Sequence, residues 1–191
     1  MRYIMRRIIA IIVCICFTGA AMAQLQITEP DKSPLDVSYH PHGYPILKFQ
    51  TKTAPTTPLA RVIYSRPQKN GRTIFGEVVK YNELWRLGAN ESTEIEFYRD
   101  VTIGKAKLLK GRYSLYCLPQ PGQWTIIFNK GLDSWGAFSY DKTKDVLRTS
   151  INVANAEAVV EFFTMVFDNS GNLVILWDNQ KAMLPIKYAA K

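Results

Sequence analysis

From residue 60 onward, the chain alternates between short runs rich in β-branched and aromatic residues and clusters of turn-forming residues. Runs of this kind are typical of β-strands. They predict strands at residues 60–65, 92–98, 111–118, 123–129, 146–153, 159–168, 173–177 and 182–188. Two turn-forming clusters, at residues 119–122 and 168–172, are expected to fold the neighbouring strands into hairpins.

The alternation of side chains within these runs predicts which faces are buried. At residues 93–97, Ile95 and Phe97 share one face, and Glu94 and Glu96 share the other. Successive side chains of a strand point to opposite faces, so the two carboxylates are expected to face solvent. Two later strands each carry a large apolar face, formed by Trp124, Ile126 and Phe128 and by Phe163, Met165 and Phe167.

The predicted fold class is all-β and mainly antiparallel, with one domain over residues 60–188 built as a β-sandwich or an open barrel. Residues 24–59 are rich in Pro, Thr and Lys and are expected to form an extended N-terminal arm. Helical periodicity is weak throughout, so at most one or two short helices are expected. The better candidate is residues 81–87, and residues 154–160 are a poorer one.

Residues 1–23 have the pattern of a secretory signal peptide. Arg2, Arg6 and Arg7 precede an apolar run at residues 8–17, and Ala21-Met22-Ala23 then supplies the small-x-small pattern that signal peptidase accepts. The run is about half the length of a membrane-spanning helix. Cleavage near Ala23 would leave a periplasmic or secreted chain without a transmembrane segment.

The charge balance changes when the signal peptide is removed. The whole chain has 24 Lys and Arg against 16 Asp and Glu, a net charge of +8, and the loss of three arginines leaves about +5. The remaining basic residues are scattered, so nucleic-acid binding is not expected. Cys117 would be the one cysteine left, which excludes an internal disulfide and predicts that a buried core stabilises the domain.

The most distinctive stretch runs from residue 64 to residue 93. Its motifs are Tyr64-Ser65-Arg66-Pro67, Gly71-Arg72, Ile74-Phe75-Gly76 and Trp85-Arg86-Leu87-Gly88-Ala89-Asn90-Glu91-Ser92-Thr93. By these and later motifs the chain resembles the exported bacterial family known as domain of unknown function 2911, over about residues 33–186. That family has no established activity, so the resemblance implies no catalytic residues.

The same stretch supplies the candidate ligand-binding residues. Arginine binds carboxylates and phosphates through two parallel hydrogen bonds, asparagine offers both a donor and an acceptor, and tryptophan stacks on sugars and rings. The candidates are Arg66, Arg72, Trp85, Arg86, Asn90 and Glu91. In the structural alternative, Glu91 pairs with one of the arginines and Asn90 satisfies backbone groups, so that the network only holds a long loop in place.

Other candidate sites are weaker. His40 and His42 are the only histidines and have no Cys or acid beside them, so neither a metal nor another cofactor is expected. A hydrolase acting on glycan would need two carboxylates, with Glu83, Glu91, Asp141 and Asp145 as candidates. The aromatic and polar loop with Trp135-Gly136 and Tyr140-Asp141 favours packing, with a carbohydrate platform as the alternative.

The leading functional hypothesis is a binding or envelope-interaction module that takes a small polar or anionic ligand or a glycan through the Arg, Asn, Glu and Trp loop. The alternatives are a hydrolase of glycan or other envelope material and a purely structural or assembly protein. The sequence does not indicate the oligomeric state.

Overall fold

The structure is a computed structural model that describes residues 27–190. The predicted signal peptide therefore lies outside the described residues. From Asp31 onward the chain forms one compact unit, which carries all the strands named below.

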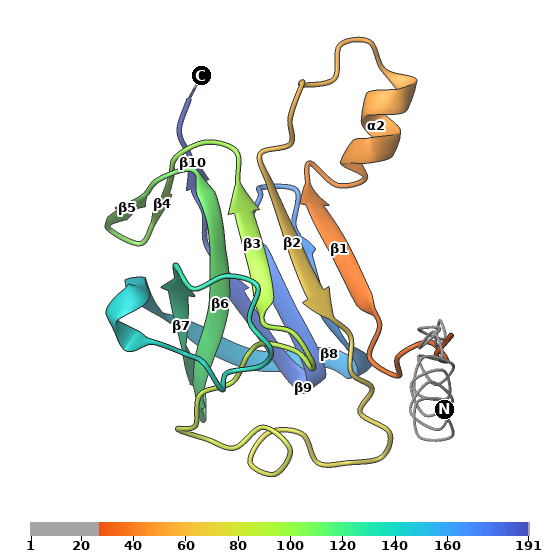
Figure 1. The fold of residues 1–191 in the computed structure, drawn as a ribbon, viewed down its shortest axis with the longest axis vertical. Helices are drawn as coiled ribbons and strands as arrows, with labels where there is room; N and C mark the ends of the chain where they lie inside the picture. The colour runs from red at the N-terminus through yellow and green to blue at the C-terminus, as the bar shows by residue number, and fades with distance from the viewer. Residues whose placement is uncertain (1–26, 191) are drawn as a thin grey trace, which may run out of the picture. The chain divides into compact units, whose positions relative to one another are not determined.

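The main sheet is antiparallel throughout, which confirms the predicted fold class. Its spatial order is β1 (Leu35–His40), β2 (Ala60–Ser65), β3 (Thr93–Phe97), β6 (Gly111–Gln120), β7 (Gln123–Asn129), β8 (Asp145–Phe167) and β9 (Leu173–Leu184). A small second sheet has the order β10 (Lys187–Tyr188), β4 (Val101–Ile103) and β5 (Ala106–Leu108). One α-helix, α2 (Tyr44–Gln50), and one 3-10 turn, η1 (Lys142–Lys144), complete the described elements (Figure 1).

The main sheet curls because β8 bends. The first part of β8 pairs with β7, and the second part pairs with β9. Along the second part, β8 advances from Asn155 to Val160 while β9 advances only from Gln180 to Asp178. Extra residues on one strand bend it and increase its twist. The curled sheet is a half-barrel, so it corresponds to the open barrel rather than to the sandwich.

The end of β8 returns to the chain that follows β2. The backbone N–H of Lys69 donates to the carbonyl of Glu161 at 2.7 Å, and the N–H of Phe163 donates to the carbonyl of Pro67 at 2.9 Å. These bonds close the curled sheet at one end. The chain after Lys69 is therefore released from the sheet and crosses the end of the half-barrel before β3 begins.

Several predicted elements differ in extent from those observed. The predicted strands at 146–153 and 159–168 are one strand, β8. The predicted strand at 173–177 lies within β9, and the one at 182–188 is divided between the end of β9 and β10. Neither of the two candidate helical segments is a helix: residues 81–87 contain turns and a bridge between Trp85 and Cys117, and residues 154–160 are part of β8. Both predicted hairpin turns are confirmed, between β6 and β7 and between β8 and β9.

The segment expected to be an extended arm contains β1 and α2. The sequence does not predict β1, because this strand exposes apolar side chains and buries a polar one. Leu35 and Val37 are 57% and 42% exposed, whereas Ser38 is buried. A strand with exposed apolar residues and a buried polar residue does not show the usual pattern of a half-buried strand.

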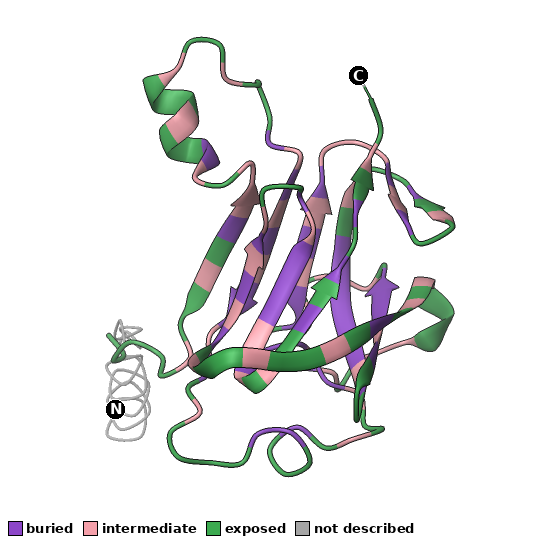
Figure 2. Cartoon of the chain, turned by 180° about the vertical axis from the view of Figure 1, so that it is seen from behind, coloured by how far each residue is buried: buried purple, intermediate pink, exposed green. Residues whose placement is uncertain are grey.

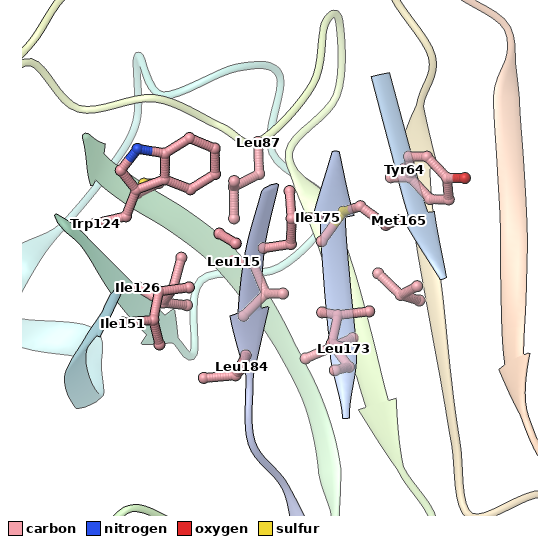
Figure 3. Packing of buried hydrophobic residues seen from close by; sticks show 14 of the residues in the cluster. Tyr64, Leu87, Leu115, Trp124, Ile126, Ile151, Met165, Leu173, Ile175 and Leu184 are labelled. Atoms are coloured by element: carbon pink, nitrogen blue, oxygen red, sulfur yellow. The ribbon is translucent and has the colours of Figure 1, made fainter. Parts of the chain in front are cut away.

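The core fills the inside of the curled sheet. All six residues of the two predicted apolar faces are buried, and so is Cys117. Figure 3 shows Trp124, Leu115 and Ile175 converging on this space. In Figure 2 the inner strands are mostly buried, while the middle of β8 is exposed.

The segment between β2 and β3 closes the end of the core. It inserts Ile74 and Phe75, which are 0% and 8% exposed. The Phe75 ring lies 5.1 Å from the Trp124 ring, 6.0 Å from Trp85 and 6.4 Å from Trp177, between ring centroids. We call residues 71–79 the plug, because they seal the aromatic core.

Glu94 and Glu96 lie on the face of β3 opposite the buried Ile95 and Phe97, as expected, but they are not freely solvated. Their side chains are only 13% and 25% exposed. Glu94 pairs with Arg112 and Glu96 pairs with Arg61, from the neighbouring strands. The outer face is therefore covered by cross-strand ion pairs.

We predict that Phe75→Ala lowers the free energy of unfolding by about 3–5 kcal/mol, the usual cost of removing a buried phenylalanine ring. Chemical denaturation measures this quantity. Phe138→Ala is the matched control, because Phe138 is 88% exposed, and it should change the free energy by less than about 0.5 kcal/mol. Equal effects of the two substitutions would contradict the role of the plug.

His40 lies beneath the turn that joins β8 to β9. Its ring centroid is 5.2 Å from that of Tyr188 and 6.0 Å from that of Phe167. A Cβ added at Gly171 would come within 2.6 Å of its Nε2 atom. Burial lowers the pKa of His40, and the carboxylate of Asp168 offsets this shift only in part.

This environment predicts a loss of stability in mild acid. Because the folded state lowers the pKa of His40 below its ordinary value of 6.5, the unfolded chain takes up the proton first as the pH falls. The free energy of unfolding should therefore decrease between about pH 7.5 and pH 5.5. His40→Phe keeps a ring in place and should weaken this dependence, as followed by the melting temperature against pH. His42→Gln, at an exposed position, should retain it; an unchanged slope in His40→Phe would rule the explanation out.

Candidate ligand-binding surface

Two loops run side by side on the outside of the half-barrel. The backbone N–H of Ser92 donates to the carbonyl of Ser134 at 2.9 Å, and the N–H of Gly136 donates to the carbonyl of Asn90 at 2.8 Å. The Ser92 hydroxyl adds a bond of 2.5 Å to the carbonyl of Gly136. We call residues 86–92 and 131–141 the loop pair. Its two halves are fixed to one another by their backbones.

The beginning of the first loop is anchored to the core. Trp85 is 7% exposed, and its Nε1 donates to the carbonyl of Gly88 at 3.1 Å. Leu87 is fully buried with a φ of 55°, a left-handed conformation that is uncommon for leucine. A Cβ at Gly88 would lie 3.1 Å from the carbonyl oxygen of Ser65, so the backbones are in close contact. The ring of Trp85 belongs to the core and does not face a ligand.

Arg86 has no counter-ion among residues 27–190. Its side chain is half-buried, and its Nε atom is buried without a hydrogen-bond partner. Burial lowers the pKa of Arg86, and no carboxylate acts to raise it again. The guanidinium is therefore a partly desolvated cation that the described residues do not neutralise.

Asn90 and Glu91 lie further along the same loop. The Asn90 side-chain amide donates to Oδ1 of Asp31 at 2.9 Å. Glu91 is exposed and forms no ion pair within the described part of the chain. It lines a hollow of about 150 Å³ together with Leu35, Ile63, Ser92, Glu94, Asp133 and Ser134. The pairing of Glu91 with an arginine, which the structural alternative requires, is not present there.

The other two candidate arginines lie elsewhere. Arg66 pairs with Asp36 at 3.1 Å and donates to the Thr164 hydroxyl at 3.2 Å, so it ties β1 to β8. Arg72 donates to the backbone carbonyls of Gln68 and Lys69, at 2.5 and 3.0 Å. The structure thus places Arg86, Asn90 and Glu91 on one loop and separates Arg66 and Arg72 from them.

Two aromatic side chains of the second loop complete the surface. Trp135 is 61% exposed and Phe138 is 88% exposed. A Cβ at Gly136 would lie 3.1 Å from the Phe138 ring and 3.7 Å from Cδ of Arg86, so these two side chains flank the same α-carbon. The sequence indicates an aromatic loop around Trp135, but no pattern in it shows that Phe138 is exposed or that Arg86 lies beside it.

The carboxylates named for a hydrolase have local structural partners. Burial alone would raise the pKa of Asp145, but hydrogen bonds from Tyr140, Asn129 and Arg148 lower it. Asp141 accepts a bond of 2.9 Å from the Thr143 N–H and caps η1. Glu83 lies 3.8 Å from Lys80 at the surface. Neither Asp141, Asp145 nor Glu83 lines the hollow at Glu91.

A groove of about 460 Å³ lies away from the loop pair, between β1, α2 and the end of β8. Its acidic group, Asp36, already accepts bonds from the Tyr64 hydroxyl at 3.3 Å and from Arg66. The N–H of Val37 donates to the other carboxylate oxygen of Asp36 at 2.7 Å. Because these polar groups satisfy one another, the groove is a weaker candidate for a ligand site than the surface at Arg86, which has no partner among residues 27–190.

The described residues contain no cluster of three or more side chains suited to hold a metal ion. His40 is packed against aromatic rings, and His42 lines the large groove. No helix in the described part of the chain has the length and apolar character needed to cross a bilayer.

Comparison with known proteins identifies one family. The family described as protein of unknown function (DUF2911) matches residues 49–186, which cover most of the chain, and the chain therefore belongs to this family. No curated protein and no solved structure gives a match.

Proposed function

We propose that this member of a family of unknown function is a binding module for an anionic ligand, and that the ligand is an acidic sugar or a phosphate-bearing glycan of the cell envelope. The N-terminal sequence supports a periplasmic or secreted location, where such ligands occur. The proposal rests on one observation, which is the half-buried guanidinium of Arg86 without a counter-ion among the described residues.

A cation in this position favours an incoming anion. A buried polar group without a partner costs about 1–3 kcal/mol. A carboxylate or phosphate placed against Arg86 would provide the missing acceptor and could do so with two parallel bonds. Arg86 has already lost part of its hydration in the free protein. Binding of an anion therefore requires less additional desolvation of the guanidinium.

The aromatic side chains favour a sugar as the carrier of the anionic group. Trp135 and Phe138 expose apolar ring faces beside a polar group, an arrangement suited to stacking on a ligand. The backbone bonds of the loop pair hold the two loops in place before the ligand arrives. Such preorganisation reduces the entropy lost on binding.

The remaining candidate residues differ in how directly they would contact the ligand. Asn90 and Glu91 lie on the rim, where an amide and a carboxylate without an ion pair in the described part of the chain can bind hydroxyl groups. Trp85 supports the loop from the core side. Arg66 and Arg72 act from further away, by fixing the beginning of the segment that carries the plug.

We predict that Arg86→Met abolishes ligand binding without destabilising the protein. Methionine keeps an aliphatic stem beside Gly136 and removes an unpartnered charge, so the melting temperature without ligand should stay equal or rise. Thermal shift with oligogalacturonate and with inorganic phosphate measures binding, and neutral oligosaccharides serve as a comparison. At about 100 times Kd, a ligand stabilises the wild type by about 2.7 kcal/mol, or about 5–10 °C.

Lys105→Met is the matched control, because it removes one positive charge at an exposed turn outside the loop pair. It should retain the shift. The proposal is wrong if Arg86→Met binds as well as Lys105→Met does. It is also wrong if no anionic probe shifts the wild type while Arg86→Met melts several degrees lower, since Arg86 would then be structural.

A further inference from the structure

The helix α2 exposes its apolar side chains. Of its seven residues only Tyr44 is buried, and the Tyr44 hydroxyl donates to the carbonyl of Pro55 at 2.9 Å. Ile46 is 62% exposed and Phe49 is 90% exposed. Figure 1 shows α2 beyond the end of β1, apart from the main sheet, and Figure 2 shows that most of its surface is exposed. One buried ring thus holds the helix in a defined position while Ile46 and Phe49, one turn apart, remain uncovered.

The charged residues in the sequence around this helix are all positive. From Val37 to Gly76 the sequence contains six Lys and Arg and no Asp or Glu. Arg61, Arg66 and Lys69 are paired with carboxylates from other segments. Lys48 and Lys52, in and just after the helix, have no carboxylate partner in the described part of the chain. Lys48 instead donates to the carbonyl of Thr56 at 3.1 Å.

We propose that α2 docks the protein on an anionic lipid bilayer, with Phe49 and Ile46 entering the interface and Lys48 and Lys52 contacting the lipid phosphates. Exposed apolar side chains flanked by lysines, in a segment that has no Asp or Glu from Val37 to Gly76, match a surface that is apolar inside and negatively charged at its boundary. Lysine side chains reach the head groups while their stems lie along the apolar region. The helix has seven residues, so it lies on the membrane and does not cross it.

Charge also argues against a second copy of the chain as the occupant. Two copies that met through α2 would bring Lys48 and Lys52 toward the same residues of the partner. The segment supplies no carboxylate to compensate for that repulsion. This docking surface is separate from the loop pair, so it can be tested independently of the proposed ligand site.

The test is co-sedimentation of the purified protein with vesicles of phosphatidylcholine alone and of phosphatidylcholine mixed with phosphatidylglycerol. The wild type should bind the mixed vesicles, and added salt should weaken the binding. Phe49→Ser should lower the partition coefficient by about tenfold or more. The double variant Lys48→Gln, Lys52→Gln should lower it by about tenfold on mixed vesicles.

Phe138→Ser is the matched control, because Phe138 is as exposed as Phe49 but belongs to the loop pair. It should leave vesicle binding unchanged, as should Arg86→Met, so the two proposals can fail separately. Absence of binding to mixed vesicles would overturn the inference, and so would an equal loss in Phe49→Ser and Phe138→Ser. A dimer in sedimentation velocity that Phe49→Ser abolishes would instead assign α2 to self-association and would equally overturn it.

Discussion

The bend of β8 is the constraint on which the rest of the structure depends. One strand serves two partners, β7 along its first part and β9 along its second, and its extra residues turn it back toward β2. Its bonds to Pro67 and Lys69 use the backbone positions at which the chain leaves β2. The chain must therefore cross the open end of the half-barrel, and this crossing creates both the plug and the first loop of the loop pair.

The three candidate arginines show how position determines the role of one residue type. Arg66 meets a carboxylate from β1, and Arg72 meets carbonyls of its own loop. Arg86 follows the buried Trp85 by one residue, so its side chain leaves the core at a place where no carboxylate of residues 27–190 pairs with it. A partly desolvated cation without a counter-ion destabilises the free protein slightly. Such a residue does not help the chain to fold, whereas it would help the protein to bind an anion.

Predictions from the sequence are correct for the strands whose buried apolar residues recur at every second position. The buried faces of β7 and of the end of β8 are predicted correctly, because large apolar residues alternate there with smaller or polar ones. β1 could not be recognised, because its apolar residues face outward and Asp36 faces Arg66, thirty positions away. For the same reason, the sequence could not distinguish Arg86 from Arg66, since the difference lies in partners brought by distant strands. Trp85 was a reasonable candidate by residue type, but the plug covers it.

Cys117 lies in the middle of β6, fully buried, and burial raises the pKa of its thiol well above the ordinary value. Thiolates, not thiols, react with oxidants and disulfides. In the oxidising compartment that the N-terminal sequence predicts, the folded chain thus keeps the thiol of Cys117 in an unreactive form. If the chain is exported as its N-terminal sequence predicts, the thiol of Cys117 would be open to oxidants only before the core forms. Rapid burial of β6 would serve as a redox safeguard, achieved by packing alone and without an oxidoreductase acting on the native state.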